Sequence, residues 1–310
     1  MLLFQQNIIA DRGILRKEPN PVMQNIDEQV SSSIVQAESR APLGKMRRIL
    51  FYVLAALLSA FLLVGFWDIV PGVVLGWLPD SVLSSIHPDF ERLFVPHRIH
   101  QTAMHAILWG LVLGVGLQLY RPERRVAPLL EALSFMLAFV VIELAVSQPV
   151  WGSAVPALFL LLLALLHPRA QDLLRLPRLD WTMAGLIALA AIPWIVFALS
   201  QVEFSRLNLP GDAHDQMEHW NRMAVFAILM IVWGLIGATD LPGWRITAWL
   251  VTYSSVVYGL QSLLFSSQAS AAPAGWAFAA VVWGSAYLIM AERRARSQPE
   301  RGEAPATYSR

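Results

Sequence analysis

The sequence predicts an all-α membrane protein whose eight transmembrane helices form two parallel four-helix repeats. Three observations lead to this prediction: an apolar composition, long uninterrupted hydrophobic runs, and a pattern of polar residues that occurs twice. Hydrophobic residues make up 56% of the 310-residue chain and charged residues only 15%, whereas about 25% of a soluble domain is charged. Backbone groups inside a bilayer must be satisfied within helices or closed barrels, and apolar runs without strand alternation favour helices.

Eight apolar runs of roughly 16–22 residues separate the charged clusters, and most are long enough for a bilayer core about 30 Å thick. The predicted spans are residues 49–70, 100–120, 126–146, 151–166, 181–200, 220–239, 246–265 and 275–291. The loop after the first span predicts a short helix on the membrane surface, because its apolar residues recur at helical spacing. These residues are Val82, Leu83, Ile86, Phe90 and Leu93.

Most arginines lie at one set of span ends, and this asymmetry predicts the orientation. Lysine and arginine are enriched on the cytoplasmic side, and an even number of spans puts both termini there. We therefore expect a multi-pass protein of a bacterial-type inner (plasma) membrane. Its predicted parts are a cytoplasmic, disordered tail at 1–47, one repeat at 48–176, a second repeat at 177–292 and a cytoplasmic tail at 293–310.

The two halves of the chain match in polar residues as well as in apolar ones. His100 aligns with His219, and Met104 with Met223, at one constant offset. Four helices in each half give both copies the same orientation, with a pseudo-twofold axis along the membrane normal. His100 and His219 would then lie at the same depth. Chance alignment of apolar segments is the alternative, but further polar pairs favour duplication: Arg125 with Arg245, Ser134 with Ser254, and Gln148 with Gln268.

Six of the seven histidines lie near the predicted extracytoplasmic ends of the spans. Helical spacing puts His97, His100 and Met104 on one face, whereas His105 points away from it. Imidazole is the commonest metal ligand and the usual axial ligand of haem. If His100 and His219 face each other, they would supply two ligands to haem or to a transition metal. The predicted ligand set is His97, His100, His214, His219, Asp215, Glu218 and Glu143.

Glu143 is predicted to be a ligand because a carboxylate within a span costs about 2.5–3.5 kcal/mol on insertion scales and is a functional candidate by default. It lies near the end of the third span. The alternative for all these residues is structural. Histidines and acids would then pair, half solvated, in the headgroup region, the methionines would pack, and Glu143 would hydrogen-bond near the interface. No metal signature such as HExxH is present to decide between the two.

Three functions are consistent with the pattern. The first is binding of a metal or haem at the extracytoplasmic face, in a redox or cofactor-handling role. The second is a carrier for a small solute or lipid, with a cavity lined by Glu143, Tyr253, Tyr258 and Gln261, although hydroxyl residues in spans more often hold helices together. The third is a non-catalytic subunit of a membrane complex or a homo-oligomer in the lipid bilayer.

Several other classes are excluded by composition and motifs. The chain has no cysteine, which excludes disulfides and thiolate sites. It also lacks the stripe of basic residues that is typical of nucleic-acid-binding proteins. It has no Walker loop and no GxSxG motif, so no enzyme class is indicated. The four-plus-four plan resembles that of haem A synthase. That family carries histidines on two helices of each half, whereas the fourth and eighth spans of this chain have none, so its function is not carried over.

Overall fold

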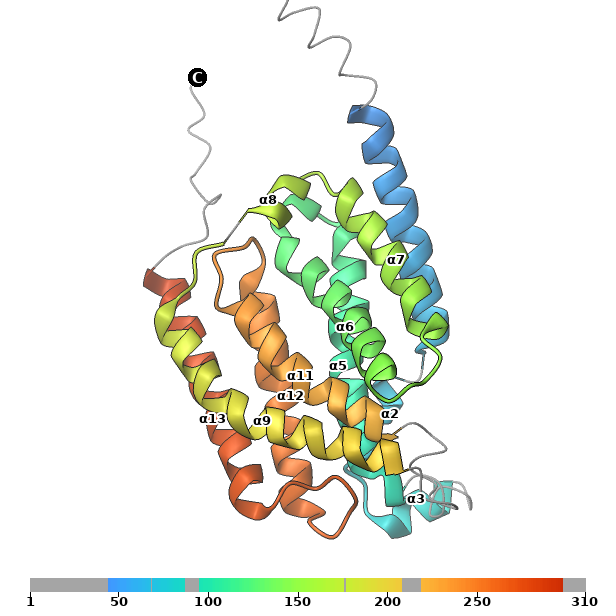
Figure 1. The fold of residues 1–310 in the computed structure, drawn as a ribbon, viewed down its shortest axis with the longest axis vertical. Helices are drawn as coiled ribbons and strands as arrows, with labels where there is room; N and C mark the ends of the chain where they lie inside the picture. Colours follow the sequence, from blue (N-terminus) through green and yellow to red (C-terminus); the bar gives the residue numbers. More distant parts are fainter. Residues whose placement is uncertain (1–43, 68, 87–94, 176, 208–218, 298–310) are drawn as a thin grey trace, which may run out of the picture. The chain divides into compact units, whose positions relative to one another are not determined.

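The computed structural model describes residues 44–67, 69–86, 95–175, 177–207 and 219–297 (Figure 1). The chain divides into two units, Met1–Arg47 and Arg48–Arg310, and the helix packing and the polar contacts below belong to the second unit. Throughout the described residues the regular structure is helical, without any strand. The all-α class predicted from the sequence is therefore confirmed.

A helix lies at each of the eight ranges predicted as spans. Their bounds are Gly44–Gly65, α5 (Arg98–Gly116), α6 (Val126–Ala145), α7 (Trp151–Leu166), α9 (Trp181–Leu207), α11 (His219–Gly237), α12 (Trp244–Leu264) and α13 (Ala274–Ser297). Shorter elements connect them: α2 (Ile69–Leu75), α3 (Asp80–Ile86), α8 (Ala170–Leu174), and the 3₁₀ turns η1 (Val95–His97), η2 (Leu117–Leu119) and η3 (Pro122–Arg124).

Six of the described helices are long and apolar enough to cross a membrane, which gives the chain the character of a multi-pass membrane protein. The two helices outside this set are α7 and α12. α7 is apolar but has only 16 residues. α12 has 21 residues, and Thr252, Ser255 and Gln261 lower its hydropathy. Eight crossings, the repeat and the orientation of the termini therefore stay predictions.

Four helices, α5, α6, α11 and α12, pack against one another and form the interior. α9 packs on α11, α13 packs on α12 and α9, and α7 packs on α6. These outer helices and Gly44–Gly65 expose large apolar side chains, among them Leu63, Leu158, Leu199 and Phe278. Exposed apolar faces of this kind suit contact with lipid tails.

The polar residues of α12 hold neighbouring helices together. The Thr252 hydroxyl donates to the carbonyl of Gly284 at 3.1 Å, and the Ser255 hydroxyl donates to that of Ala280 at 2.9 Å. Both acceptors lie on α13. Hydroxyl groups that bond across a helix contact let the two backbones approach closely. For these two residues the packing interpretation of the seventh predicted span is confirmed.

The segment after the first helix differs from its prediction. The first helix ends at Gly65, before the predicted residue 70, and α2 begins at Ile69. Gly72 and Gly76 face α5, where an added Cβ would lie 2.3 Å from His105 and 1.9 Å from Thr102. Glycine at both positions, four residues apart, therefore lets this segment approach α5 closely.

The predicted surface helix corresponds in part to α3. Val82, Leu83 and Ile86 lie on it, and Leu83 is buried. Phe90 and Leu93, which belong to the same prediction, lie outside the described residues.

Candidate metal centre

A group of histidines lies where α5 and α11 begin. His97 ends the 3₁₀ turn η1, and His100 follows in the first turn of α5. Residues three apart lie on the same helix face, so both imidazoles point to one side. His219 is the first residue of α11. The residues His97, His100 and His219 are 3%, 1% and 1% exposed.

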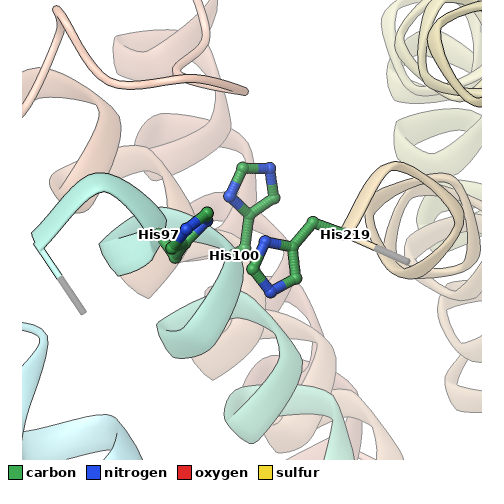
Figure 2. Close-up of side chains that lie close together, drawn as sticks. All are labelled: His97, His100 and His219. Carbon is green, nitrogen blue, oxygen red and sulfur yellow. The ribbon is translucent and has the colours of Figure 1, made fainter. Parts of the chain in front are cut away.

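Three imidazoles converge at this place (Figure 2). The ring centroid of His219 lies 4.5 Å from that of His97 and 4.8 Å from that of His100. One nitrogen from each ring lies within 4.8 Å of the others, which makes the three a group that could hold a metal ion. The prediction that His100 and His219 face each other agrees with this arrangement. We call His97, His100 and His219 the histidine cluster.

Two residues, Ser270 and Gln201, form a hydrogen-bonded chain that ends at Nε2 of His100. Its Nε2 lies 2.8 Å from the hydroxyl of Ser270, and that hydroxyl donates to Oε1 of Gln201 at 2.8 Å. Ser270 lies in the loop between α12 and α13, and Gln201 lies on α9. The carbonyl of Ser270 accepts the hydroxyl of Tyr258 at 3.0 Å. Three segments distant in sequence thus orient one imidazole.

Aromatic and cationic groups enclose the histidine cluster. The ring of Trp220 meets His100 edge-on at 5.5 Å, and Phe204 packs on Trp220 at 5.1 Å. Arg98, between the two histidines of η1 and α5, is buried and binds the carboxylate of Asp80 at 2.7 Å. Its guanidinium also lies 4.1 Å from the ring centre of Phe265. The cationic charge next to the cluster is therefore compensated.

The cluster has the donor set of a transition-metal site. Neutral imidazole nitrogens bind zinc at about 2.0–2.1 Å, and three protein ligands leave a fourth position for water or substrate. A tetrahedral site places such nitrogens about 3.3 Å apart. Because the three nitrogens already lie within 4.8 Å of one another, closing on an ion needs ring movements on the order of 1 Å.

Haem fits this arrangement poorly. Two axial histidines must point a nitrogen at the iron from opposite sides of the porphyrin. The rings of His100 and His219 instead stack face to face, 4.8 Å apart and 15° from parallel. A macrocycle has no room between stacked rings at this separation. The geometry therefore favours a small metal ion over the predicted haem.

The remaining predicted ligands lie elsewhere or are not described. The carboxylate of Glu143 accepts a hydrogen bond from Ser153 and is not part of the three-residue group. His105 is likewise outside that group, and its Nδ1 lies 2.6 Å from the carbonyl of Gln101. His214, Asp215 and Glu218 lie outside the described residues.

The methionines that accompany the histidines pack in the hydrophobic interior. Met223 is fully buried, and Met104 is partly buried against the same core. These contacts are those of ordinary core residues. The packing interpretation of Met104 and Met223 is the one that the structure favours.

Sequence reasoning missed Glu131, which lies on α6 among all four interior helices. It is 0% exposed, and its Oε2 accepts the hydroxyl of Thr247 at 3.0 Å. An added Cβ at Gly110 would lie 2.8 Å from its Oε1, and the indole of Trp233 donates to its carbonyl at 3.2 Å. Its signal was the one that selected Glu143, because both acids lie inside the apolar run 126–146. Ser270 and Gln201 were also missed, and neither carried a local signal.

No family model matches the chain, and comparisons with curated proteins and with solved structures likewise found no match.

Proposed function

We propose that this protein is a multi-pass membrane protein that binds a transition-metal ion through His97, His100 and His219. The observation that carries the proposal is the convergence of three buried imidazoles, with one nitrogen from each within 4.8 Å of the others. Gathering three polar side chains in an apolar helix bundle has a desolvation cost. A metal ion bound by all three rings would offset that cost.

Three imidazoles suit zinc, copper, iron or nickel rather than calcium or magnesium, which prefer oxygen ligands. A redox role would exclude zinc, which has no redox chemistry. Water, a substrate or a further side chain would occupy the fourth position. Glu218, His214 and Asp215 are the proposed additional ligands, since they lie within five residues before His219 in the sequence.

The proposed site lies at the extracytoplasmic face of a bacterial-type inner membrane. Support comes from the position of the histidines at the first turns of α5 and α11. The opposite end of α5, about 28 Å away for 19 residues, leads into Arg121, Arg124 and Arg125. Arginine-rich ends mark the cytoplasmic side. The duplicated four-helix plan, with His100 and His219 as equivalent residues, belongs to the same proposal.

Metal analysis of the purified protein tests this proposal. The full chain in mild detergent is expected to bind about one equivalent of zinc or copper, measured by mass spectrometry after equilibration and desalting. His100→Ala and His219→Ala should lose that metal. His105→Ala is the matched control, because His105 is also a buried histidine of α5 but lies outside the cluster. Sub-stoichiometric metal in the wild type, whichever ion is supplied, would refute the proposal.

Optical spectroscopy on the same samples separates a metal ion from haem. An ion held by three imidazoles gives no Soret band. A Soret band that disappears in His100→Ala and His219→Ala would show instead that the stacked rings separate to admit a porphyrin.

The carrier alternative has less support. Tyr258 packs against Trp194, Phe197 and Phe226 at centroid distances of 5.2–5.6 Å. The side-chain amide of Gln261 donates to the carbonyl of Gly76 at 2.9 Å. These two residues were expected to line a cavity, and both are instead engaged by neighbouring residues.

A further inference from the structure

We infer that Ser270 and Gln201 are positioning residues that hold the proton of His100 on Nε2, so that His100 binds the metal through Nδ1. This inference rests on the proposed function, since it assigns the ligand atom of that site. It also brings α9 and the loop between α12 and α13 into a site whose ligands come from η1, α5 and α11.

The hydrogen-bond directions lead to this assignment. A serine hydroxyl has one hydrogen to donate and two lone pairs that accept. The Ser270 hydroxyl uses its hydrogen toward Oε1 of Gln201 at 2.8 Å, so at its other contact it accepts. The partner there is Nε2 of His100 at 2.8 Å. Nε2 must then carry the N–H.

The tautomer follows from the chemistry of imidazole. A neutral ring carries one proton, on one of its two nitrogens, and the other nitrogen keeps a lone pair. With the proton on Nε2, Nδ1 of His100 is the nitrogen able to bind a cation. Metal-binding histidines almost always donate their second ring N–H to a hydrogen-bond partner, and loss of that partner typically lowers metal affinity about 10–100-fold.

The backbone at Ser270 supports a specific role for this residue. Its φ angle is +62°, in the left-handed region that side-chain-bearing residues seldom adopt. Such positions cost about 1–3 kcal/mol and persist where the surroundings hold them, often at functional sites. Here Tyr258, itself packed among Trp194, Phe197 and Phe226, holds the carbonyl of Ser270.

The position of Gln201 also supports a specific role. It lies on α9 and is buried, although α9 is otherwise one of the apolar outer helices. A buried amide in such a helix is unfavourable unless it is hydrogen-bonded. Its Oε1 accepts from Ser270, so this polar residue of α9 meets the loop residue that contacts His100.

A zinc titration with matched variants tests the inference. Ser270→Gly removes the hydroxyl and suits the positive φ, because glycine adopts left-handed conformations without steric cost. The backbone is therefore expected to keep its course, and the variant should bind zinc about 10–100-fold more weakly. Gln201→Leu should act in the same direction. Ser267→Gly, the same substitution at an exposed position of the same loop, should bind like the wild type.

The tautomer itself gives a readout that a merely structural role would not change. In protein with ¹⁵N-labelled histidine, the nitrogen spectrum of metal-free wild type should show His100 protonated on Nε2, assigned by loss of its signals in His100→Ala. In Ser270→Gly the proton should redistribute toward Nδ1. Thermal stability of the metal-free Ser270→Gly protein should equal or exceed that of the wild type.

The outcomes separate this inference from the function on which it rests. Normal zinc binding by the wild type with equal affinity in Ser270→Gly overturns the inference and leaves the proposed function intact. A proton on Nδ1 of His100 in the wild type overturns it as well. Absence of binding by the wild type of every transition-metal ion supplied, zinc and copper included, overturns both.

Discussion

Among the described residues, His167 and the histidine cluster are buried alike, and their nitrogens are used differently. His167, after the end of α7, is fully buried. Its Nε2 lies 3.0 Å from the carbonyl of Pro122, and its Nδ1 accepts the backbone N–H of Arg169 at 3.0 Å. Both nitrogens are therefore bound to backbone groups of the fold. In the histidine cluster one nitrogen from each of the three rings lies within 4.8 Å of the other two.

The difference shows that burial alone does not mark a ligand. A buried polar group is expected to be hydrogen-bonded, and His167 meets that expectation while tying η3 to the turn after α7. Three imidazole nitrogens that lie close together can instead bind one cation through their lone pairs. The direction of the nitrogens, rather than their exposure, separates a structural histidine from a candidate ligand.

The largest effects are expected from mutating one histidine in each of the two regions. His219→Ala removes a ligand, so it should lower metal affinity by more than the about 10–100-fold that is typical when only a ligand's hydrogen-bond partner is lost, with a small change in thermal stability. His167→Gln should keep the full metal content and lower the melting temperature, because two buried backbone partners lose their bonds. Mass spectrometry and thermal denaturation of the metal-free proteins measure the two effects. Loss of metal in His167→Gln would contradict the distinction.

The packing around Glu131 gives the next largest effect. Gly110→Ala places a Cβ 2.3 Å from the ring of Trp233 and 2.8 Å from Oε1 of Glu131. The indole is held by its bond to Ser134 at 3.0 Å, so it cannot move away freely. We expect destabilisation of about 1–3 kcal/mol, as for other overpacked cores, with metal stoichiometry unchanged.

Gly116→Ala is the matched control for that substitution. It lies on the same helix, and nothing lies within 4 Å of the added Cβ. Alanine in a helix is favoured over glycine by roughly 0.5–1 kcal/mol, so this variant should be as stable as the wild type or more stable. Denaturation in detergent compares the two. Equal stability of both variants would show that the interior helices adjust around Gly110.

Local patterns predicted the elements of the fold better than their assembly. Long apolar runs identify helices at all eight predicted ranges, because a bilayer-length apolar run has one stable backbone form. The pairing of His100 with His219 followed from comparing the two halves of the sequence. His97 joins them because it lies three residues before His100.

The contacts that complete the site could not be predicted from the sequence. Ser270 and Gln201 meet His100 from distant segments, and neither position has a periodicity that points to it. Glu143 was selected as an acid inside a span, yet its acceptor role toward Ser153 depends on how α7 folds back beside α6. Glu131 carried the same signal and was overlooked.

The structural role of His167 also predicts how the stability of the protein depends on pH. Burial lowers the pKa of His167 below its ordinary value, and the hydrogen bond to Pro122 opposes that shift only in part. The unfolded chain then binds a proton at higher pH than the folded chain, so the free energy of unfolding should fall as the pH drops below about 6.5. His167→Gln removes this titration.

Thermal melts of the metal-free proteins test this between about pH 8 and about pH 5. The melting temperature should fall more steeply with decreasing pH in the wild type than in His167→Gln. The remaining slope in the variant comes from the other titratable groups of the chain. Identical slopes would mean that His167 keeps its ordinary proton affinity in the fold.

The smallest effect is expected at Glu143, and it tests the boundary of the ligand set. Glu143→Gln keeps a side-chain oxygen that can accept from Ser153, so stability should change by less than about 1 kcal/mol. Zinc affinity should stay within about threefold of the wild type, since an acid outside the ligand set acts only through screened long-range charge. A tenfold or larger loss in a zinc titration would place the carboxylate in the site and require α6 to approach the histidine cluster when metal binds.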